Sequence, residues 1–205
     1  MEIVTKEIMI ASKNKNKIKE IKDIVSGDVV LKSFMDYPDI PDVLEDGKTI
    51  EENSMKKAVE VARFTGLYSI ADDTGLFVQV LGGEPGVYSA RWAGEGCTYA
   101  DNNRKLLNAL KNVEFKDRKA VFKCAITIAS PDGDTHTEVG EIEGYIAENL
   151  RGENGFGYDP VFYVPALDKT LAEMDFETKN KISHRRKALE LIKPYLERVI
   201  YYGRI

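Results

Sequence analysis

Four short stretches of the sequence combine residue types that could bind a phosphate, a metal ion or a base. The first, Ser12–Glu20, carries lysine at positions 13, 15, 17 and 19, with Asn14 and Asn16 between the first three. It follows an apolar run and precedes a helical pattern, so backbone N–H groups and the positive end of a helix dipole would face outward there. Lysines are unfavourable at that end unless an anion neutralises them. The stretch therefore predicts a phosphate site or, in the simpler interpretation, a solvated basic helix start.

The second stretch contains two adjacent aspartates, Asp72 and Asp73, directly after the apolar run Tyr68–Ala71. Ligands of open α/β sheets bind beyond the carboxyl ends of strands, which favours a role in chemistry. Neighbouring residues of an extended chain point to opposite faces, so only one of the two should face a given site. An Asx turn that closes the strand is the alternative. Glu45 lies in a loop upstream, and a carboxylate near phosphate suits Mg²⁺.

The third stretch, Gly155–Pro160, holds Phe156 between two glycines on what we expect to be a tight, accessible loop. A ring presented in this way could stack on a base. A core phenylalanine in an ordinary loop would give the same pattern, so both interpretations stay open.

The fourth stretch, Lys179–Arg186, contains Ser183, a natural N-cap, which places His184 and Arg185 on the first turn of a helix. Cations at that position need an anion or an acceptor. Arginine offers five donors and no acceptor, so it can bond the 6-oxo edge of a purine and cannot accept from a 6-amino group. A site built on such bonds rejects the wrong edge, because its buried donors would be left unpaired.

The apolar pattern between these stretches predicts the elements that must position them. The expected strands are 7–11, 29–33, 68–71 and a long hairpin of 118–130 with 135–145. The expected helices are about 15–25, 49–64, 100–110 and 183–201. Thr49 and Glu52 have the spacing of a capping box at the start of the second helix. Strand–helix units followed by a long hairpin indicate an α/β fold with a mixed sheet.

Composition narrows the classes of function. A chain of 205 residues with no internal repeat or linker predicts one domain, or one domain with two lobes. The net charge of −5 at pH 7 argues against a nucleic-acid coat or a membrane-surface role. Cys97 and Cys124 have no metal or redox spacing, and two histidines make a zinc site implausible. The N-terminal residues have neither a signal-peptide nor a membrane-span pattern, so we expect a cytoplasmic protein.

Five motifs, in order, resemble the signatures of the inosine triphosphate pyrophosphatase family. They are Ser12-x-Asn14-x-x-Lys17-x-x-Glu20, Ala71–Leu76, Leu81–Arg91, Phe156–Pro160 and Ser183–Arg185. The resemblance covers nearly the whole chain and implies an α/β fold with an elongated mixed β-sheet flanked by helices. It implies a single domain, residues 1–205, whose two lobes surround a central nucleotide-binding cleft. It also implies a homodimer and a Mg²⁺-dependent enzyme that hydrolyses ITP, dITP and XTP to the monophosphate and pyrophosphate, removing deaminated purines from the nucleotide pool.

The resemblance assigns roles position by position. Asp73 matches the acidic residue that binds metal and activates water, and Glu45 matches a metal position of some members. The substrate-binding residues that it implies are Ser12, Lys13, Asn14, Lys15, Asn16, Lys17, Lys57, Thr74, Phe156, Gly157, Tyr158, Asp159, Lys179, His184 and Arg185. Among these, Phe156 would stack on the base. Lys13 and Thr74 depart from the glycine and serine of many bacterial members, which are mild changes.

The expected mechanism is attack by a metal-positioned water on the α-phosphorus, with Asp73 as base and pyrophosphate leaving as a magnesium complex. The expected partner is a single purine nucleoside triphosphate, with no polymeric nucleic acid and no membrane. Two alternatives stay open: a house-cleaning pyrophosphatase of other base specificity, and a nucleotide sensor that does not hydrolyse its ligand. A sensor has no need for Asp73 and Glu45 in addition to the lysines.

Overall fold

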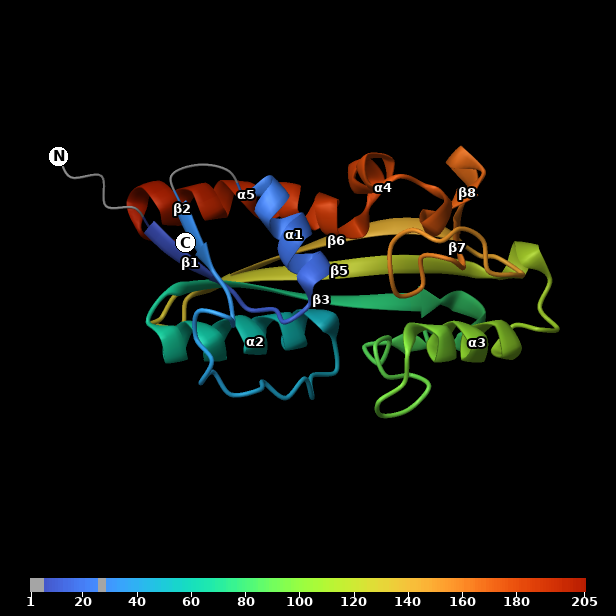
Figure 1. Ribbon diagram of the computed structural model, residues 1–205, viewed down its shortest axis with the longest axis horizontal. Coiled ribbons are helices and arrows are strands. Elements are labelled where there is room, and N and C mark those ends of the chain that lie inside the picture. The colour runs from blue at the N-terminus through green and yellow to red at the C-terminus, as the bar shows by residue number, and fades with distance from the viewer. Residues whose placement is uncertain (1–5, 26–28) are drawn as a thin grey trace. The chain divides into compact units, whose positions relative to one another are not determined.

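The computed structural model describes residues 6–25 and 29–205 (Figure 1). Its helices are α1 (Lys15–Ile24), α2 (Ile50–Thr65), α3 (Tyr99–Ala109), α4 (Phe176–Ile182) and α5 (His184–Tyr202). Its strands are β1 (Lys6–Ile10), β2 (Val29–Lys32), β3 (Tyr68–Val78), β4 (Pro85–Gly86), β5 (Lys119–Ala129), β6 (Thr135–Ile146), β7 (Phe162–Val164) and β8 (Lys169–Thr170). The elements expected from the sequence are confirmed to within one residue at each end, except for the end of β3.

The strands form one sheet in the order β2-β1-β3-β5-β6-β7-β8, with β4 paired to β3. β1 runs parallel to both β2 and β3, whereas β7 runs antiparallel to β6 and β8. The expected α/β class with a mixed sheet is therefore confirmed. No helix in the described part of the chain carries an apolar stretch long enough to cross a lipid bilayer.

The chain divides into two compact units. Unit 1 consists of the described residues up to Asp73 together with Cys124–Gly140 and Arg185–Ile205. Unit 2 consists of Thr74–Lys123 and Glu141–His184. The strands β3, β5 and β6 each contribute residues to both units.

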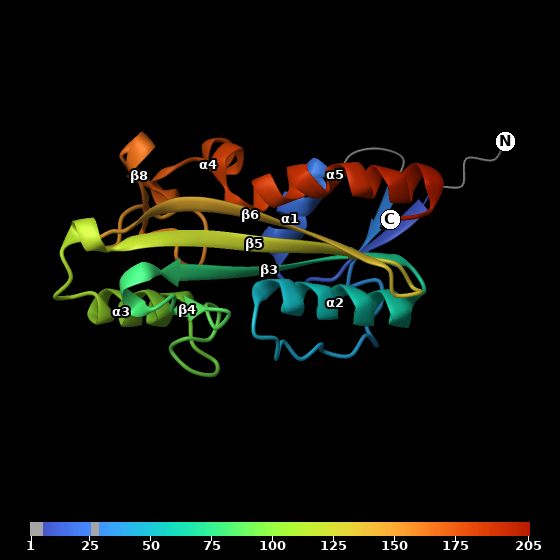
Figure 2. The same ribbon diagram turned by 180° about the vertical axis from the view of Figure 1, so that it is seen from behind.

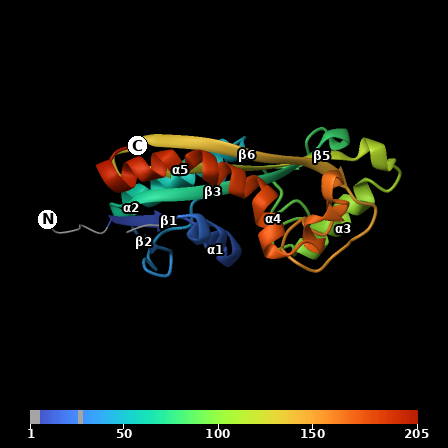
Figure 3. The same ribbon diagram turned by 90° about the horizontal axis from the view of Figure 1, so that it is seen from above.

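In unit 1, helices cover both faces of the parallel strands. Ile8 and Ile10 of β1 pack into an apolar cluster with α1 and α5, while Met9 packs into a second cluster with α2. This alternation explains the continuous apolar run of β1, because a strand buried on both faces has no polar side. Seen from behind, α2 lies on one side of the strands, and α1 and α5 lie on the other side (Figure 2). Seen from above, α5 lies in front of the strands and α2 lies behind them (Figure 3).

Unit 2 has its own core, which includes Leu106 of α3, Phe122 of β5 and Phe162 of β7. A buried arginine, Arg118, bonds backbone carbonyl groups near the end of α3. The Arg118 guanidinium donates to the carbonyl oxygens of Leu110 (2.9 Å), Val113 (3.0 Å) and Ala147 (3.2 Å). Such bonds satisfy carbonyls that a helix end leaves without intrahelical partners.

Two local expectations need correction. β3 does not end at Ala71 but continues to Val78, so Asp72 and Asp73 lie within a strand and form no Asx turn. At the start of α2, the Thr49 Oγ1 accepts from the Glu52 N–H (3.1 Å) as expected, but the Glu52 carboxylate accepts from the Lys48 N–H (2.6 Å) rather than from Thr49. The capping box is therefore only half formed, because the acidic side chain reaches one residue further back.

Candidate functional site

The loop before α1 is shaped by its own polar side chains. The Asn14 Oδ1 caps the helix by accepting from the backbone N–H groups of Asn16 (3.0 Å) and Lys17 (3.4 Å). The Ser12 Oγ accepts from the Asn14 N–H (3.2 Å). These bonds hold the turn that aims Lys17, whereas Lys13, Lys15 and Asn16 are exposed. The sequence correctly placed this stretch at a strand-to-helix junction.

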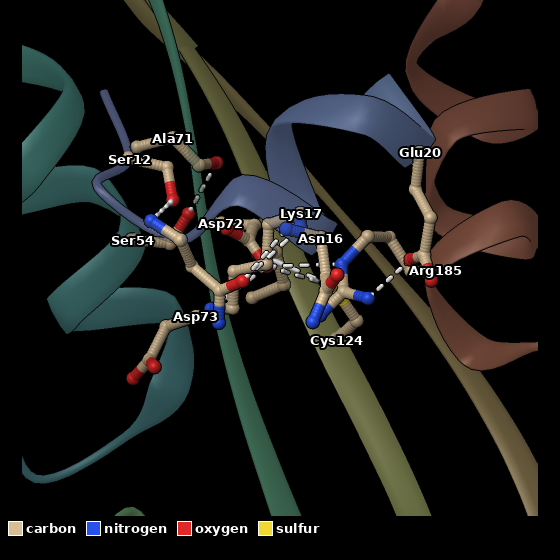
Figure 4. Close-up of polar contacts among 12 residues, drawn as sticks. Ser12, Asn16, Lys17, Glu20, Ser54, Ala71, Asp72, Asp73, Cys124 and Arg185 are labelled. Carbon is tan, nitrogen blue, oxygen red and sulfur yellow. Dashed lines mark hydrogen bonds and ion pairs between the residues drawn. The ribbon is translucent and has the colours of Figure 1, made fainter. Parts of the chain in front are cut away.

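A buried cluster of four charges joins this helix to β3 and α5 (Figure 4). The Asp72 Oδ2 lies 3.0 Å from the Lys17 Nζ and 3.1 Å from the Arg185 Nε. Glu20, one turn along α1 from Lys17, forms an ion pair with the Arg185 Nη1. Lysine at the start of α1 and arginine at the start of α5 thus find their counter-charges within the chain, which resolves the unfavourable position noted in the sequence.

The charges of this cluster shift the pKa values of Asp72 and Arg185. Burial alone would raise the pKa of Asp72, but Lys17, Arg185 and Lys57 together lower it well below its ordinary range. Burial would likewise lower the pKa of Arg185, yet Asp72, Cys124 and Glu20 raise it, so the guanidinium stays charged. The Cys124 Sγ lies 3.9 Å from the Asp72 Oδ2. Cys124 is a free, buried cysteine.

Asp73 has a different set of neighbours, as the alternation along a strand predicts. Its Oδ2 accepts from the Asn53 Nδ2 at 3.1 Å, and only 8% of the residue is exposed. Burial and the nearby Glu45 carboxylate raise the pKa of Asp73, while Lys57, Lys17 and the Asn53 hydrogen bond oppose this rise. The pKa values of the two neighbouring carboxyls are therefore shifted in opposite directions, that of Asp72 downwards and that of Asp73 upwards.

Glu45 and Lys57 complete this part of unit 1. The Lys57 Nζ lies 2.5 Å from the Glu45 Oε1. Burial opposes the charge of Lys57, but the carboxylates of Asp72, Glu45 and Asp73 raise its pKa. Lys57 therefore remains a cation at the position where the resemblance predicts a phosphate contact. Lys13 lies apart from this group and pairs with the exposed Asp42.

The donor chemistry of this group fits a hard divalent cation. Glu45 and Asp73 both offer carboxylate oxygens, and the Glu45 carboxylate is close enough to Asp73 to raise the pKa of Asp73. Magnesium usually takes one or two protein carboxylates and completes its coordination with water and substrate phosphates. Within residues 6–25 and 29–205, no three His, Cys, Asp or Glu side chains converge as a metal cage. A site shared between the protein and a phosphate ligand is therefore the kind that these residues could form.

In unit 2 the loop Gly155–Pro160, called the aromatic loop below, is hydrogen-bonded to α4. The Asp159 Oδ2 accepts from the Phe156 backbone N–H (2.7 Å) and from the Lys179 Nζ (2.6 Å). The same Nζ lies 4.7 Å from the centroid of the Phe156 ring. Gly155 adopts φ +76°, and a Cβ there would lie 2.0 Å from the Asp159 Oδ2. Glycine is required at this position because both the backbone angle and the close carboxylate exclude a side chain.

Other predicted residues of unit 2 have mainly internal contacts. The Tyr158 hydroxyl donates to the Ser89 carbonyl (3.0 Å), and burial raises the pKa of Tyr158. The Gly157 carbonyl accepts from the Asn103 side chain (2.9 Å). The His184 ring is buried and stacks flat on Phe122 at 4.5 Å. Thr74 is half-buried in β3.

The predicted site residues fall in both units. Lys17, Lys57, Glu45, Asp73 and Arg185 belong to unit 1, while Phe156, Asp159, Lys179 and His184 belong to unit 2.

The sequence analysis left three residues out of the candidate site. Asp72 and Glu20 bind Arg185, and Asn53 binds Asp73. Glu20 carried a signal, because it lies three residues after Lys17 on the same helix. Asn53 carried none, since its partner is twenty residues away in sequence.

Comparisons with known proteins agree over more than nine-tenths of the chain. The model of the Ham1 family matches residues 8–195. The dITP/XTP pyrophosphatases of Geobacter sulfurreducens and Thermoanaerobacter pseudethanolicus are 48% and 50% identical, covering 92% and 93% of this chain and 96% of each relative. A HAM1 protein from Coxiella burnetii superposes with a TM-score of 0.87 at 39% identity, and the Ham1 protein of Staphylococcus aureus with 0.85 at 48% identity. Both alignments cover 94% of this chain and 98% of the other.

Proposed function

The chain belongs to the Ham1 family, and on this basis we propose that it hydrolyses ITP, dITP and XTP to the nucleoside monophosphate and pyrophosphate. It is a nucleoside-triphosphate pyrophosphatase that removes deaminated purines from the nucleotide pool. The observation that carries the proposal is the group in unit 1 that brings together the carboxylates of Asp73 and Glu45 and the cationic Lys57. Hydrolysis of a phosphoanhydride requires these two kinds of residue together, a base for water and cations for phosphate oxygens.

In this proposal Asp73 accepts the proton of the attacking water, since its pKa is raised, as suits a general base, whereas the pKa of Asp72 is lowered. Lys17 and Lys57 neutralise phosphate oxygens, supported by the loop residues Ser12–Asn16. Glu45 and Asp73 would hold Mg²⁺. When bound, this ion supplies positive charge that stabilises the phosphate oxygens of the reaction.

The residues of unit 2 are proposed to recognise the base and the sugar. Phe156 stacks on the purine, and Asp159 with Lys179 forms polar contacts beside it, together with Gly157, Tyr158 and Thr74. His184 of this unit and Arg185 of unit 1 are proposed to favour the 6-oxo edge. The Arg185 bonds to Asp72 and Glu20 use the Nε and Nη1 of a group with five N–H donors, so they are compatible with this role.

We further propose that the chain acts as one domain of two lobes, forms a homodimer and works in the cytoplasm. Size-exclusion chromatography with light scattering would test the dimer, and a mass corresponding to a single chain would contradict it.

The test of the activity is pyrophosphate release from a panel of ITP, XTP, dITP, ATP, GTP and dUTP at saturating Mg²⁺. We expect ITP, dITP and XTP to be hydrolysed in preference to the standard nucleotides. Equal rates on ATP and GTP, or preference for dUTP, would identify a pyrophosphatase of other base specificity. Binding without release of pyrophosphate would identify a sensor.

A variant links the activity to the site. Asp73→Asn keeps the shape of the side chain and removes the base, so turnover of ITP should fall by about 100-fold or more. ITP binding, measured by calorimetry, should stay measurable. Asp42→Asn, which removes an exposed carboxylate of the same unit, serves as the control. Normal turnover in Asp73→Asn would remove Asp73 from the proposed mechanism.

A further inference from the structure

Asn53 is a buried amide that contacts two segments of the proposed active site at once. It lies in the first turn of α2 with 1% of its surface exposed. Its Nδ2 donates to the Asp73 Oδ2 at 3.1 Å, and its Oδ1 accepts from the Gly47 N–H at 2.8 Å. One side chain therefore connects β3 to the loop that carries Glu45.

The contact between Asn53 and the loop that carries Glu45 is so close that it requires glycine at position 47. A Cβ at Gly47 would lie 2.7 Å from the Asn53 Oδ1 and 2.8 Å from the Glu52 Cβ. Gly47 lies two residues after Glu45, so the Asn53 bond fixes the backbone next to the second carboxylate of the site. The missing side chain of Gly47 is what lets the amide reach that backbone.

Only an amide supplies both bonds in this place. Asparagine offers donors on one end and an acceptor on the other, whereas aspartate would offer acceptors to both Asp73 and Gly47. The helix start holds the Asn53 backbone, because its N–H bonds to the Thr49 carbonyl at 3.2 Å. With backbone and side chain both fixed, the donor that reaches Asp73 is held in one orientation.

We propose that Asn53 is a positioning residue for the hydrolysis, which fixes the orientation of the Asp73 carboxylate and ties it to the Glu45 loop. This inference rests on the proposed pyrophosphatase activity. Asn53 does not touch the reacting atoms and acts through Asp73. The lysines and the aromatic loop bind the substrate without it, so its loss should slow turnover and leave nucleotide binding nearly unchanged.

Two variants distinguish the two hydrogen bonds of the Asn53 side chain. Asn53→Ala removes both bonds. Asn53→Asp has nearly the same shape and keeps an acceptor for Gly47, but it replaces the donor to Asp73 by an oxygen. We expect both variants to lower kcat on ITP by about 10- to 100-fold, the usual cost of losing a residue that orients a catalytic ligand. KM, and the affinity for a non-hydrolysable ITP analogue, should change by less than about threefold.

A matched control accounts for lost stability. Thr127 is fully buried in unit 1, where its Oγ1 accepts from Ser54 at 3.0 Å and bonds Thr137 at 2.7 Å. Thr127→Val removes the buried hydrogen bonds to Ser54 and Thr137 and leaves the Asn53 bond to Asp73 in place. It should lower the midpoint of thermal unfolding while kcat stays within twofold of the unsubstituted protein.

The outcomes separate the inference from the activity on which it rests. If Asn53→Asp retains full kcat, Asn53 only holds the Gly47 segment and the proposed positioning role is wrong. The same conclusion follows if kcat falls no further than in Thr127→Val at an equal loss of thermal stability. If Asn53→Ala does not fold, Asn53→Asp decides alone. If the unsubstituted protein releases no pyrophosphate from ITP, the proposed function itself fails.

Discussion

Replacing Asp72 by asparagine would test the role of the buried charge cluster in unit 1. The amide keeps the shape of the side chain and removes its charge. Lys17 and Arg185 then lose the carboxylate that lies 3.0 and 3.1 Å from them. Arg185 keeps Glu20 as a partner, and Lys17 can turn towards solvent because 17% of its side chain is exposed.

The size of the effect follows from burial. Breaking a buried ion pair by removing one partner costs about 3–5 kcal/mol, because the remaining charge stays in a poorly solvated place. The retained Glu20 places the expected loss of unfolding free energy at the lower end, about 3 kcal/mol. For a chain of this size, each kcal/mol shifts the unfolding midpoint by about 2–4 °C, which gives a decrease of about 6–12 °C.

The dependence of this loss on pH is a sharper test. The pKa of Asp72 is lowered in the folded protein. A carboxylate of this kind stabilises the fold at every pH above its unfolded pKa of about 3.9, and the stabilisation disappears as pH falls towards the folded pKa. The gap in stability between the unsubstituted protein and Asp72→Asn should therefore be constant between pH 5 and 8 and shrink only below about pH 4.

Calorimetry or circular dichroism of both proteins across this pH range is the measurement. Asp42→Asn is the control, since its partner Lys13 is exposed and the loss of an exposed pair should move the midpoint by less than about 4 °C. A midpoint for Asp72→Asn equal to that of the control would refute the reasoning. A gap that closes as pH rises from 5 to 8 would refute it as well.

Three further predictions concern turnover. Phe156→Ala should raise KM for ITP by about 5- to 150-fold, because stacking on an aromatic ring contributes about 1–3 kcal/mol per base. Steady-state kinetics with Phe156→Leu as the control would measure it. Gly155→Ala should lower kcat/KM for ITP, because its Cβ would lie 2.0 Å from the Asp159 Oδ2; an unchanged value would show that the loop does not position the ring. Chelation of divalent ions by EDTA should abolish pyrophosphate release, and added Mg²⁺ should restore it; activity that persists in EDTA would contradict the metal assignment.

Local patterns in the sequence were enough to predict most elements. The alternation of apolar residues predicts the strands and helices of unit 1, and the strand period predicts that Asp72 and Asp73 have different partners. The length of β3 was missed because two aspartates are typical of turns. In the structure each aspartate has its own polar partners, which compensate for placing carboxylates inside a strand.

The contacts that organise the site could not be predicted in the same way. Arg185 bonds Asp72 and Glu20, which lie 113 and 165 residues earlier in the chain. The sequence of the first turn of α5 indicates only that the cation at Arg185 needs an anionic partner. It does not indicate which of the chain's many carboxylates is that partner. The bond between Asn53 and Asp73 likewise depends on the close approach of α2 to β3, which no short-range pattern specifies.

The division of unit 1 into separate chain segments has a consequence for synthesis. Ile8 and Ile10 pack in one cluster with Leu189 and Ile192 of α5. When only the first 180 residues have left the ribosome, the apolar strand β1 is therefore exposed, because α5, which packs against it, has not yet been synthesised. The ion pairs of Asp72 with Arg185 are equally absent at that stage. Unit 1 can complete its core only after translation has passed α5, so chains truncated before this helix should be targets for chaperones and proteases.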